Sequence, residues 1–210
     1  MRPRTTWLMF TVATVVALVL VYPYLSLDIE DSRLQVRNGL HYYVLVGHIA
    51  TAAVALVLGP LQFVPKVRAR RRVHRTIGRV YLLAGVLPSA VATIPVAMWS
   101  GRLVTQIGLT TAAALWLVTA GLAYRAARRG DFTAHRDWMT RNYALTFLAV
   151  TARVIVPLSL LVRIPLGGLA AGSIGEAATS MIPIGQTLGW IVNLIVAESI
   201  IRRRTAAARP

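Results

Sequence analysis

Two short segments with nearly the same order of residues hold two of the four histidines in this chain. One reads HRTIGRVY (residues 74–81) and the other reads HRDWMTRNY (residues 135–143). Arginine side chains bind phosphate and carboxylate through paired hydrogen bonds, and imidazoles bind metal ions or transfer protons. If the two segments meet in space, they predict either an anion site or a haem site in which arginines hold the propionates.

Other polar side chains stand at the same ends of neighbouring apolar runs and complete the candidate site. The candidate ligand-binding residues are Gln62, His74, Arg75, Arg79, His135, Arg136, Arg141, Asn193 and Glu198. Only His74 and His135 would bind a metal, and only if the protein holds a haem b. Phosphate-bearing lipid and haem are not distinguished by this spacing.

Glu198 is the one carboxylate within a long apolar run. A buried carboxylate needs a partner, because an unpaired charge is costly in the membrane. We expect an ion pair with Arg79 or Arg141, which would fasten the last apolar run to the third or the fifth. A role in proton transfer is the alternative.

A second polar layer lies deeper, formed by His48, Arg153 and Gln186. An arginine at the centre of a membrane helix costs about 2.5–3.5 kcal/mol on insertion scales, so such residues usually have a partner or a function. The three could line a cavity for an anionic or carbonyl-bearing ligand. Alternatively, Arg153 reaches outward or binds backbone carbonyls near Pro157, and His48 is a satisfied polar group.

Long apolar runs must position these residues. The chain is 56% hydrophobic and 14% charged, whereas soluble domains contain about 25% charged residues. Runs of about 20 apolar residues predict transmembrane helices. The predicted spans are Trp7–Leu27, His41–Val64, Ile77–Ser100, Leu103–Tyr124, Trp138–Val162 and Thr179–Ile201.

The sequence therefore predicts an all-α polytopic membrane protein with six transmembrane helices. We divide it into an N-terminal transmembrane helix with its outer loop (residues 1–40), a five-helix membrane core (residues 41–201) and a basic cytoplasmic tail (residues 202–210). The unit of helix, basic loop, His-Arg and helix occurs twice, which suggests a parallel two-helix repeat. Chance similarity of two basic loops is the alternative.

The net charge of +16 follows the membrane topology. Most basic residues precede the first span, lie within residues 66–79 and 125–141, or follow the last span. Because basic residues concentrate in cytoplasmic loops, both termini are predicted to be cytoplasmic. The expected partners are the lipid bilayer and its anionic lipids, not nucleic acid. A homo-oligomer or a membrane partner complex stays open.

No signature of an enzyme is present, and whether the chain is one stays open. The sequence has no cysteine, so it has no thiolate nucleophile and no thiolate metal ligand. It also lacks a Ser/His/Asp pattern, a carboxylate pair and an HExxH motif.

Four sequence blocks, in order, resemble a known family. They are GPLQF at 59–63, HRxxGRxY at 74–81, HRxWMxRxYA at 135–144, and Trp190, Asn193, Ala197 and Glu198 near the end. They are similar to the bacterial membrane proteins catalogued as domain of unknown function 2306, over about His41 to Glu198. The resemblance implies a multi-pass protein of the bacterial cytoplasmic (plasma) membrane, the cell inner membrane, and implies no activity.

A looser similarity links the chain to di-haem membrane cytochromes of the b561 and ferric-reductase type. In those proteins histidines on alternate helices bind haem, whereas the fourth predicted span here contains no histidine. The similarity thus implies at most one haem, at His74 and His135.

Three functions are consistent with these features. The first is a transporter or lipid-handling protein that binds an anionic ligand, lipid headgroup or substrate at the cytoplasmic Arg/His residues. The second is a membrane redox carrier with a single haem b. The third is an accessory subunit or scaffold of a membrane complex.

Overall fold

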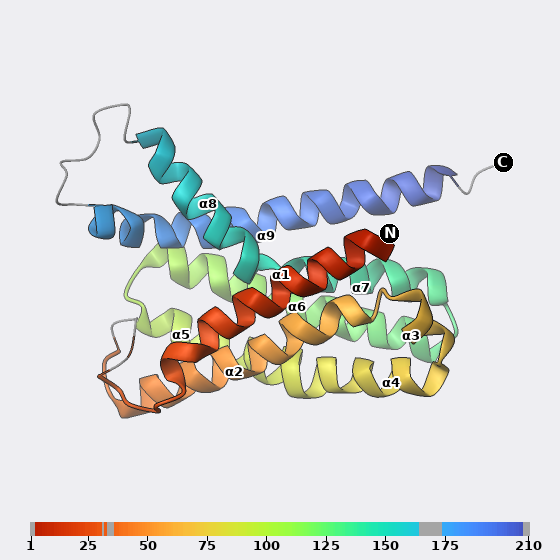
Figure 1. Ribbon diagram of the computed structural model, residues 1–210, viewed down its shortest axis with the longest axis horizontal. Helices are drawn as coiled ribbons and strands as arrows, with labels where there is room; N and C mark the ends of the chain where they lie inside the picture. Colours follow the sequence, from red (N-terminus) through yellow and green to blue (C-terminus); the bar gives the residue numbers. More distant parts are fainter. Residues whose placement is uncertain (1–2, 31, 33–35, 164–173, 208–210) are drawn as a thin grey trace.

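The computed structural model describes residues 3–30, 32, 36–163 and 174–207, and every regular element in them is helical (Figure 1). The helices are α1 (Pro3–Val21), η1 (Tyr22–Tyr24), α2 (Gly39–Leu61), α3 (Pro65–Ala69), α4 (Arg71–Val80), η2 (Tyr81–Val86), α5 (Leu87–Trp99), α6 (Leu103–Arg128), α7 (Phe132–Thr146), α8 (Leu148–Arg163) and α9 (Ile174–Ala207).

The lengths and composition of these helices confirm a polytopic membrane protein. Five continuous segments are long and apolar enough to span a membrane, and there are six spans if α7 and α8, which pass the same test only together, count as one bent span. Helices α2 and α6 run in one direction, while α4–α5 and α7 run in the other (Figure 1). The first residues of α1 and the last residues of α9 lie at the same end of the molecule as α3. We call this the cytoplasmic end, following the positive-inside rule.

The third span begins earlier than predicted. It was expected to start at Ile77, yet helix extends without a gap from Arg71 to Trp99. The HRTIGRVY segment is therefore helix rather than loop. The π-helical segment η2 lies just before Pro88. Proline has no N–H to donate to the preceding turn, and a wider turn accommodates this loss.

The fifth span is not the single helix that was predicted. Helices α7 and α8 meet at a bend of 46° next to Phe147. Asn193 of α9 bridges the break: its amide nitrogen donates to the carbonyl of Ala144 (2.9 Å), and its oxygen accepts from the hydroxyl of Thr151 (2.8 Å). Asn193 thus supplies the hydrogen bonds that a broken helix lacks within a membrane.

Close approach between helices depends on small residues in α2. A Cβ added at Gly85 would lie 2.9 Å from Ala55, and one added at Gly59 would collide with the ring of Tyr143. The Tyr143 hydroxyl donates to the carbonyl of Leu56, one turn before Gly59 (3.1 Å). Ala55 and Gly59 therefore allow close packing in the second half of α2, while a Cβ at Gly47 would meet nothing within 4 Å.

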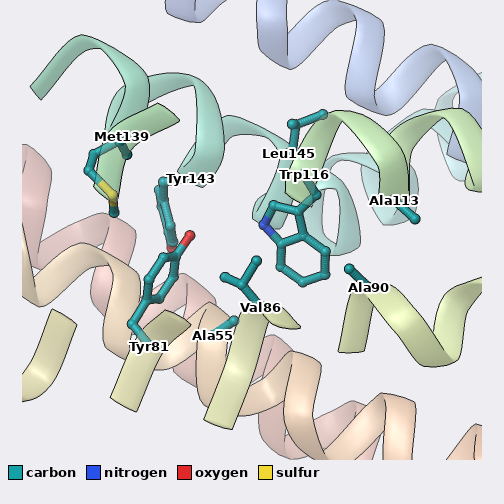
Figure 2. Close-up of a cluster of buried hydrophobic side chains, with 10 residues drawn as sticks. Ala55, Tyr81, Val86, Ala90, Ala113, Trp116, Met139, Tyr143 and Leu145 are labelled. Carbon is teal, nitrogen blue, oxygen red and sulfur yellow. The ribbon is translucent and has the colours of Figure 1, made fainter. Parts of the chain in front are cut away.

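A buried hydrogen-bond network joins α4–η2 to α7 and α6. The Tyr81 hydroxyl donates to Asn142 Oδ1 (2.6 Å) and lies 2.8 Å from the Thr146 hydroxyl, which also accepts from the indole N–H of Trp116 (3.0 Å). Asn142 in turn donates to Thr119 (2.9 Å). Figure 2 shows Tyr81 and Tyr143 side by side in this core. Because every member has a partner, the network fixes how the helices face each other.

The two predicted repeat units meet at equivalent positions. Tyr81 lies seven residues after His74, and Asn142 lies seven residues after His135. Seven residues are close to two helical turns, so each of these side chains lies on the same helix face as its histidine. The Tyr81–Asn142 bond therefore predicts that the histidines also face each other.

Gly59→Ala tests the close packing of α2 on α7. The added Cβ collides with Tyr143, so we expect a destabilisation of about 1–3 kcal/mol and a lower thermal midpoint of the detergent-purified protein. Gly121→Ala is the matched control, because a Cβ there meets nothing within 4 Å. Its midpoint should stay the same or rise, since alanine favours helix over glycine. Equal midpoints for the two variants would contradict this packing.

Candidate functional site

The two histidines of the matching segments meet at the cytoplasmic end. The ring centroids of His74 on α4 and His135 on α7 are 6.4 Å apart, and the rings are nearly perpendicular (89°). Both side chains are half-buried. The structure thus brings together two residues that are 61 positions apart in the sequence, as the anion and haem hypotheses both require.

A backbone carbonyl sets the orientation of His135. Its Nδ1 lies 2.9 Å from the carbonyl oxygen of Ala123 on α6. A carbonyl only accepts, so Nδ1 carries the proton and Nε2 carries a free lone pair. An imidazole held in this way has one defined nitrogen available to a ligand.

Gln62 forms the buried floor beside His74. It follows Pro60 at the end of α2 and is only 6% exposed. Its Oε1 lies 3.3 Å from where a Cβ of Gly78 would stand, one turn of α4 after His74. Gln62 Nε2 and His74 Nδ1 are both buried and have no hydrogen-bond partner. Leaving such a group unpaired costs about 1–3 kcal/mol, so a partner from outside the protein would be stabilised here.

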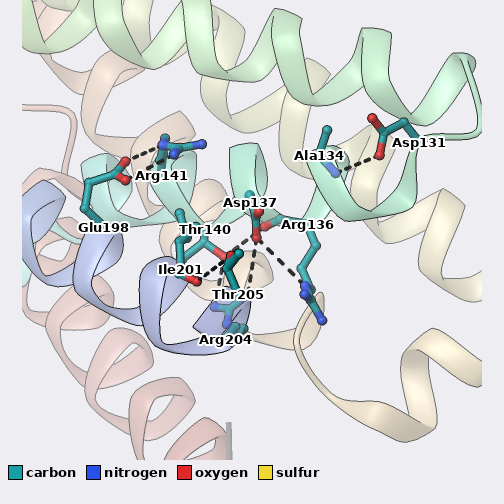
Figure 3. A network of polar contacts seen from close by, with 10 residues as sticks. All are labelled: Asp131, Ala134, Arg136, Asp137, Thr140, Arg141, Glu198, Ile201, Arg204 and Thr205. Atoms are coloured by element: carbon teal, nitrogen blue, oxygen red, sulfur yellow. Dashed lines mark hydrogen bonds and ion pairs between the residues drawn. The ribbon is translucent and has the colours of Figure 1, made fainter. Parts of the chain in front are cut away.

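A loosely paired carboxylate, Asp137, lies two residues after His135 on α7. Asp137 Oδ1 is 3.9 Å from the Arg136 guanidinium and 3.7 Å from that of Arg204 on α9, with no hydrogen bond to either (Figure 3). Arg204 also donates to the Thr140 hydroxyl at 3.3 Å. At these distances the arginines keep free donors for a further acceptor.

A third arginine, Arg68 of α3, lies within electrostatic range of both His74 and Arg204. Three guanidinium groups and one carboxylate leave an excess of positive charge beside the imidazoles. We define the cytoplasmic cluster as Gln62, Arg68, His74, His135, Arg136, Asp137 and Arg204. Arg68 and Arg204 are absent from the predicted set, because nothing in the sequence distinguishes them from the other arginines near them.

The predicted ion pair of Glu198 is confirmed, with Arg141 as its partner. Arg141 Nε lies 2.5 Å from Oε1 and Nη2 lies 3.2 Å from Oε2, which makes the contact bidentate (Figure 3). The guanidinium also stacks over the Trp138 ring at 4.5 Å. This pair fastens α9 to α7. Arg141 lies in the third turn of α7 rather than at its start, and its guanidinium is already paired with Glu198.

Arg75 and Arg79 do not join the histidines. Both are exposed, and neither has an ion pair or side-chain hydrogen bond in the described part of the chain. With about 100° per residue, they lie well around α4 from the inward face of His74 and Gly78. The predicted arginine set is therefore divided between two faces of this helix.

The deeper polar layer is not joined by hydrogen bonds. His48 Nδ1 lies 3.0 Å from both the carbonyl and the hydroxyl of Ser89 and 3.2 Å from the Thr93 hydroxyl, so it is a satisfied link between α2 and α5. Arg153 donates to the carbonyl of Ala149 in its own helix (2.6 Å) and is exposed. Gln186 is half-buried, and its Oε1 has no partner.

The chemistry available at the cytoplasmic cluster is recognition of negatively charged oxygen. Arginine guanidinium groups, the amide N–H of Gln62 and an N–H of the His74 imidazole can donate to such a ligand. A metal ion would find two imidazoles, but the described residues contain no group of three or more His, Cys, Asp or Glu that could hold one.

Comparison with known proteins places the chain in one family. No curated protein and no solved structure matches it. The family model described as "Predicted membrane protein (DUF2306)" matches residues 45–201, a range that leaves out α1 and contains His74, His135, Asn193 and Glu198. The chain, with its six apolar spans and its paired His-Arg segments, belongs to this family of predicted membrane proteins, DUF2306.

Proposed function

We propose that this protein binds an anionic ligand, a phosphate- or carboxylate-bearing substrate or lipid headgroup, at the cytoplasmic cluster, and that it carries or handles that ligand in the bacterial plasma membrane. The observation that carries the proposal is the pair of unpartnered buried groups, Gln62 Nε2 and His74 Nδ1, at an end of the molecule where Arg68 lies within electrostatic range of His74 and of Arg204.

The charges favour an anion over a cation. Arg68, Arg136 and Arg204 surround the site, and Asp137 neutralises only one of them. An incoming anion takes free guanidinium N–H groups above and an amide N–H below, which satisfies donors that are now unpaired. A cation would meet repulsion from the same arginines.

The helices that carry the histidines are also the ones that are interrupted. The α4–α5 span contains the π-helical segment Tyr81–Val86, and the α7–α8 span bends by 46°. Broken helices in membrane transporters lie next to substrate sites, where they supply backbone groups and allow movement. This feature supports transport or lipid handling over a purely structural role.

Ligand-dependent stability tests the proposal. Inorganic phosphate or citrate, compared with chloride at equal ionic strength, should raise the thermal midpoint of the purified protein, because a ligand at 100 times its Kd adds about 2.7 kcal/mol. Gln62→Leu and Arg136→Gln should lose most of this rise. Arg125→Gln, an exposed arginine at the same end, is the matched control and should keep it. The proposal fails if neither anion raises the thermal midpoint more than chloride does, or if Arg125→Gln loses the rise as fully as the other two variants.

A second candidate is the single-haem redox carrier, favoured by the spacing of the imidazoles. With about 2 Å from a metal ion to each nitrogen, two rings on opposite sides of an ion have centres about 6 Å apart, close to the observed 6.4 Å. The residues one turn below do not fit a macrocycle, however. Gln62 lies against Gly78, and Met139 is buried in the core. The distance between the two imidazoles suits a metal ion between them, but Gln62 and Met139 occupy space that a haem would need.

An absorption spectrum separates the two candidates. Protein expressed with haem precursor and purified in detergent should show no Soret band if the site binds anions. The redox hypothesis instead requires a Soret band and a reduced α-band, both lost in His74→Ala and in His135→Ala. Such a spectrum would replace the anion proposal with the cytochrome function.

A further inference from the structure

One face of the third span carries three arginines followed by an apolar groove. Arg72, Arg75, Arg79 and Leu83 are spaced by three, four and four residues, which places them on one side of the helix. All four are exposed. This outward face is distinct from the inward face that carries His74, so it takes no part in the cytoplasmic cluster.

The three arginines have no partners within the described part of the chain. The ion pairs there use Arg136, Arg141 and Arg204 instead. Asp131, the nearest-lying acidic residue of the α6–α7 turn, caps the start of α7 through the N–H of Ala134. Three unpaired guanidinium groups on one helix face repel one another unless an anion lies between them.

An apolar groove begins one turn beyond Arg79. It has a volume of about 610 Å³ and is open to the surface. Its lining residues are Val44, Leu83, Leu87, Pro88, Val91, Ala92 and Pro95. At about 1.5 Å per residue, the helix from Leu83 to Pro95 is about 18 Å long.

The groove follows from the local sequence. The π-helical segment Tyr81–Val86 widens the turn before Pro88, while Gly85 brings the opposite side of the helix against Ala55. The prolines and the small Ala92 then leave a shallow channel beside Val44 of α2.

We propose that this face binds an anionic phospholipid of the cytoplasmic leaflet, with its phosphate on Arg75 and Arg79 and one acyl chain in the groove. The match is one of charge and of length. The unpaired arginines lie at the cytoplasmic end of the groove, where headgroups are found. One leaflet of a hydrocarbon core of about 30 Å is about 15 Å deep, so a chain that starts at Arg79 would lie along the part of the groove from Leu83 to Pro88. The site differs from the cytoplasmic cluster in residues and in helix face, so it does not rest on the proposed function.

Competitive lipid binding tests the headgroup contacts. The full chain is incubated in detergent with equimolar phosphatidylglycerol and phosphatidylcholine, and the bound lipids are counted by native mass spectrometry. The unmodified protein should prefer phosphatidylglycerol, and Arg75→Gln with Arg79→Gln should lower this preference about thirtyfold, from roughly 1 kcal/mol for each of the two basic residues. Arg125→Gln with Arg128→Gln is the matched control, two exposed arginines at the same end, and should keep it.

A second experiment tests whether an acyl chain of the lipid lies in the groove. The sequence has no cysteine, so Val91→Cys can carry a single bimane label in vesicles. Phosphatidylglycerol with brominated chains should quench the label at lower mole fraction than brominated phosphatidylcholine, and Arg75→Gln with Arg79→Gln should remove the difference. Ala92→Phe should fill the groove and weaken quenching by both lipids.

Three results would overturn the proposal. They are no preference for phosphatidylglycerol in the unmodified protein, an equal loss in the Arg125 and Arg128 control, and equal quenching by the two brominated lipids. The second result would mean that general surface charge, rather than a site, attracts the lipid. None of these variants changes Gln62 or His74, so failure here and failure of anion binding at the cytoplasmic cluster are distinguishable.

Discussion

The contact between α4–η2 and α7 is the constraint on which the rest of the structure depends. Tyr81 donates to Asn142 across this interface in a buried network with no unpaired member, and Tyr143 fits against Gly59, where no side chain would leave room. Within a membrane the hydrophobic effect does not hold helices together, so close packing and hydrogen bonds must do so. Because Tyr81 and Asn142 each lie two turns after a histidine, this contact also fixes where His74 and His135 meet.

Several polar contacts between helices are fully satisfied, whereas buried atoms without partners occur at the cytoplasmic cluster and also elsewhere, as at Thr187 Oγ1 and Trp190 Nε1. Arg141 with Glu198, Asn193 at the helix break and His48 beside Ser89 all have complete partners, and each joins two helices. The cytoplasmic cluster differs, since Gln62 and His74 keep buried atoms without partners and Asp137 holds two arginines only loosely. The outward arginines of α4 differ again, because they are exposed beside an apolar groove. The same helix thus has an inward polar face, for which we propose an anionic ligand, and an outward face, for which we propose a phospholipid.

Much of the fold follows from the sequence, because apolar runs and basic loops directly reflect the membrane. From the sequence, the ion-pair partner of Glu198 could be limited to Arg79 or Arg141, because few basic residues lie at the same depth in the membrane as Glu198. The break next to Phe147 could not be found this way. The residue in the sequence that suggested an interruption was Pro157, ten residues after the break. The hydrogen bonds across the break come instead from Asn193 of α9. Helical periodicity could have shown that Arg75 and Arg79 lie on a different face of α4 from His74, but only if the helix had been predicted to start at Arg71. Starting it at Ile77 concealed that His74 and Arg79 lie on different faces.

Cross-linking between α4 and α7 tests the central claim most directly. In this cysteine-free chain, His74→Cys with His135→Cys can be treated in native membranes with a short bis-methanethiosulfonate reagent. Thr76→Cys with His135→Cys is the comparison, because Thr76 is exposed and lies about 200° around α4 from His74. The structure predicts rapid cross-linking of the first pair and little of the second. Equal rates, or no cross-link between positions 74 and 135, would contradict a site built from the two matching segments.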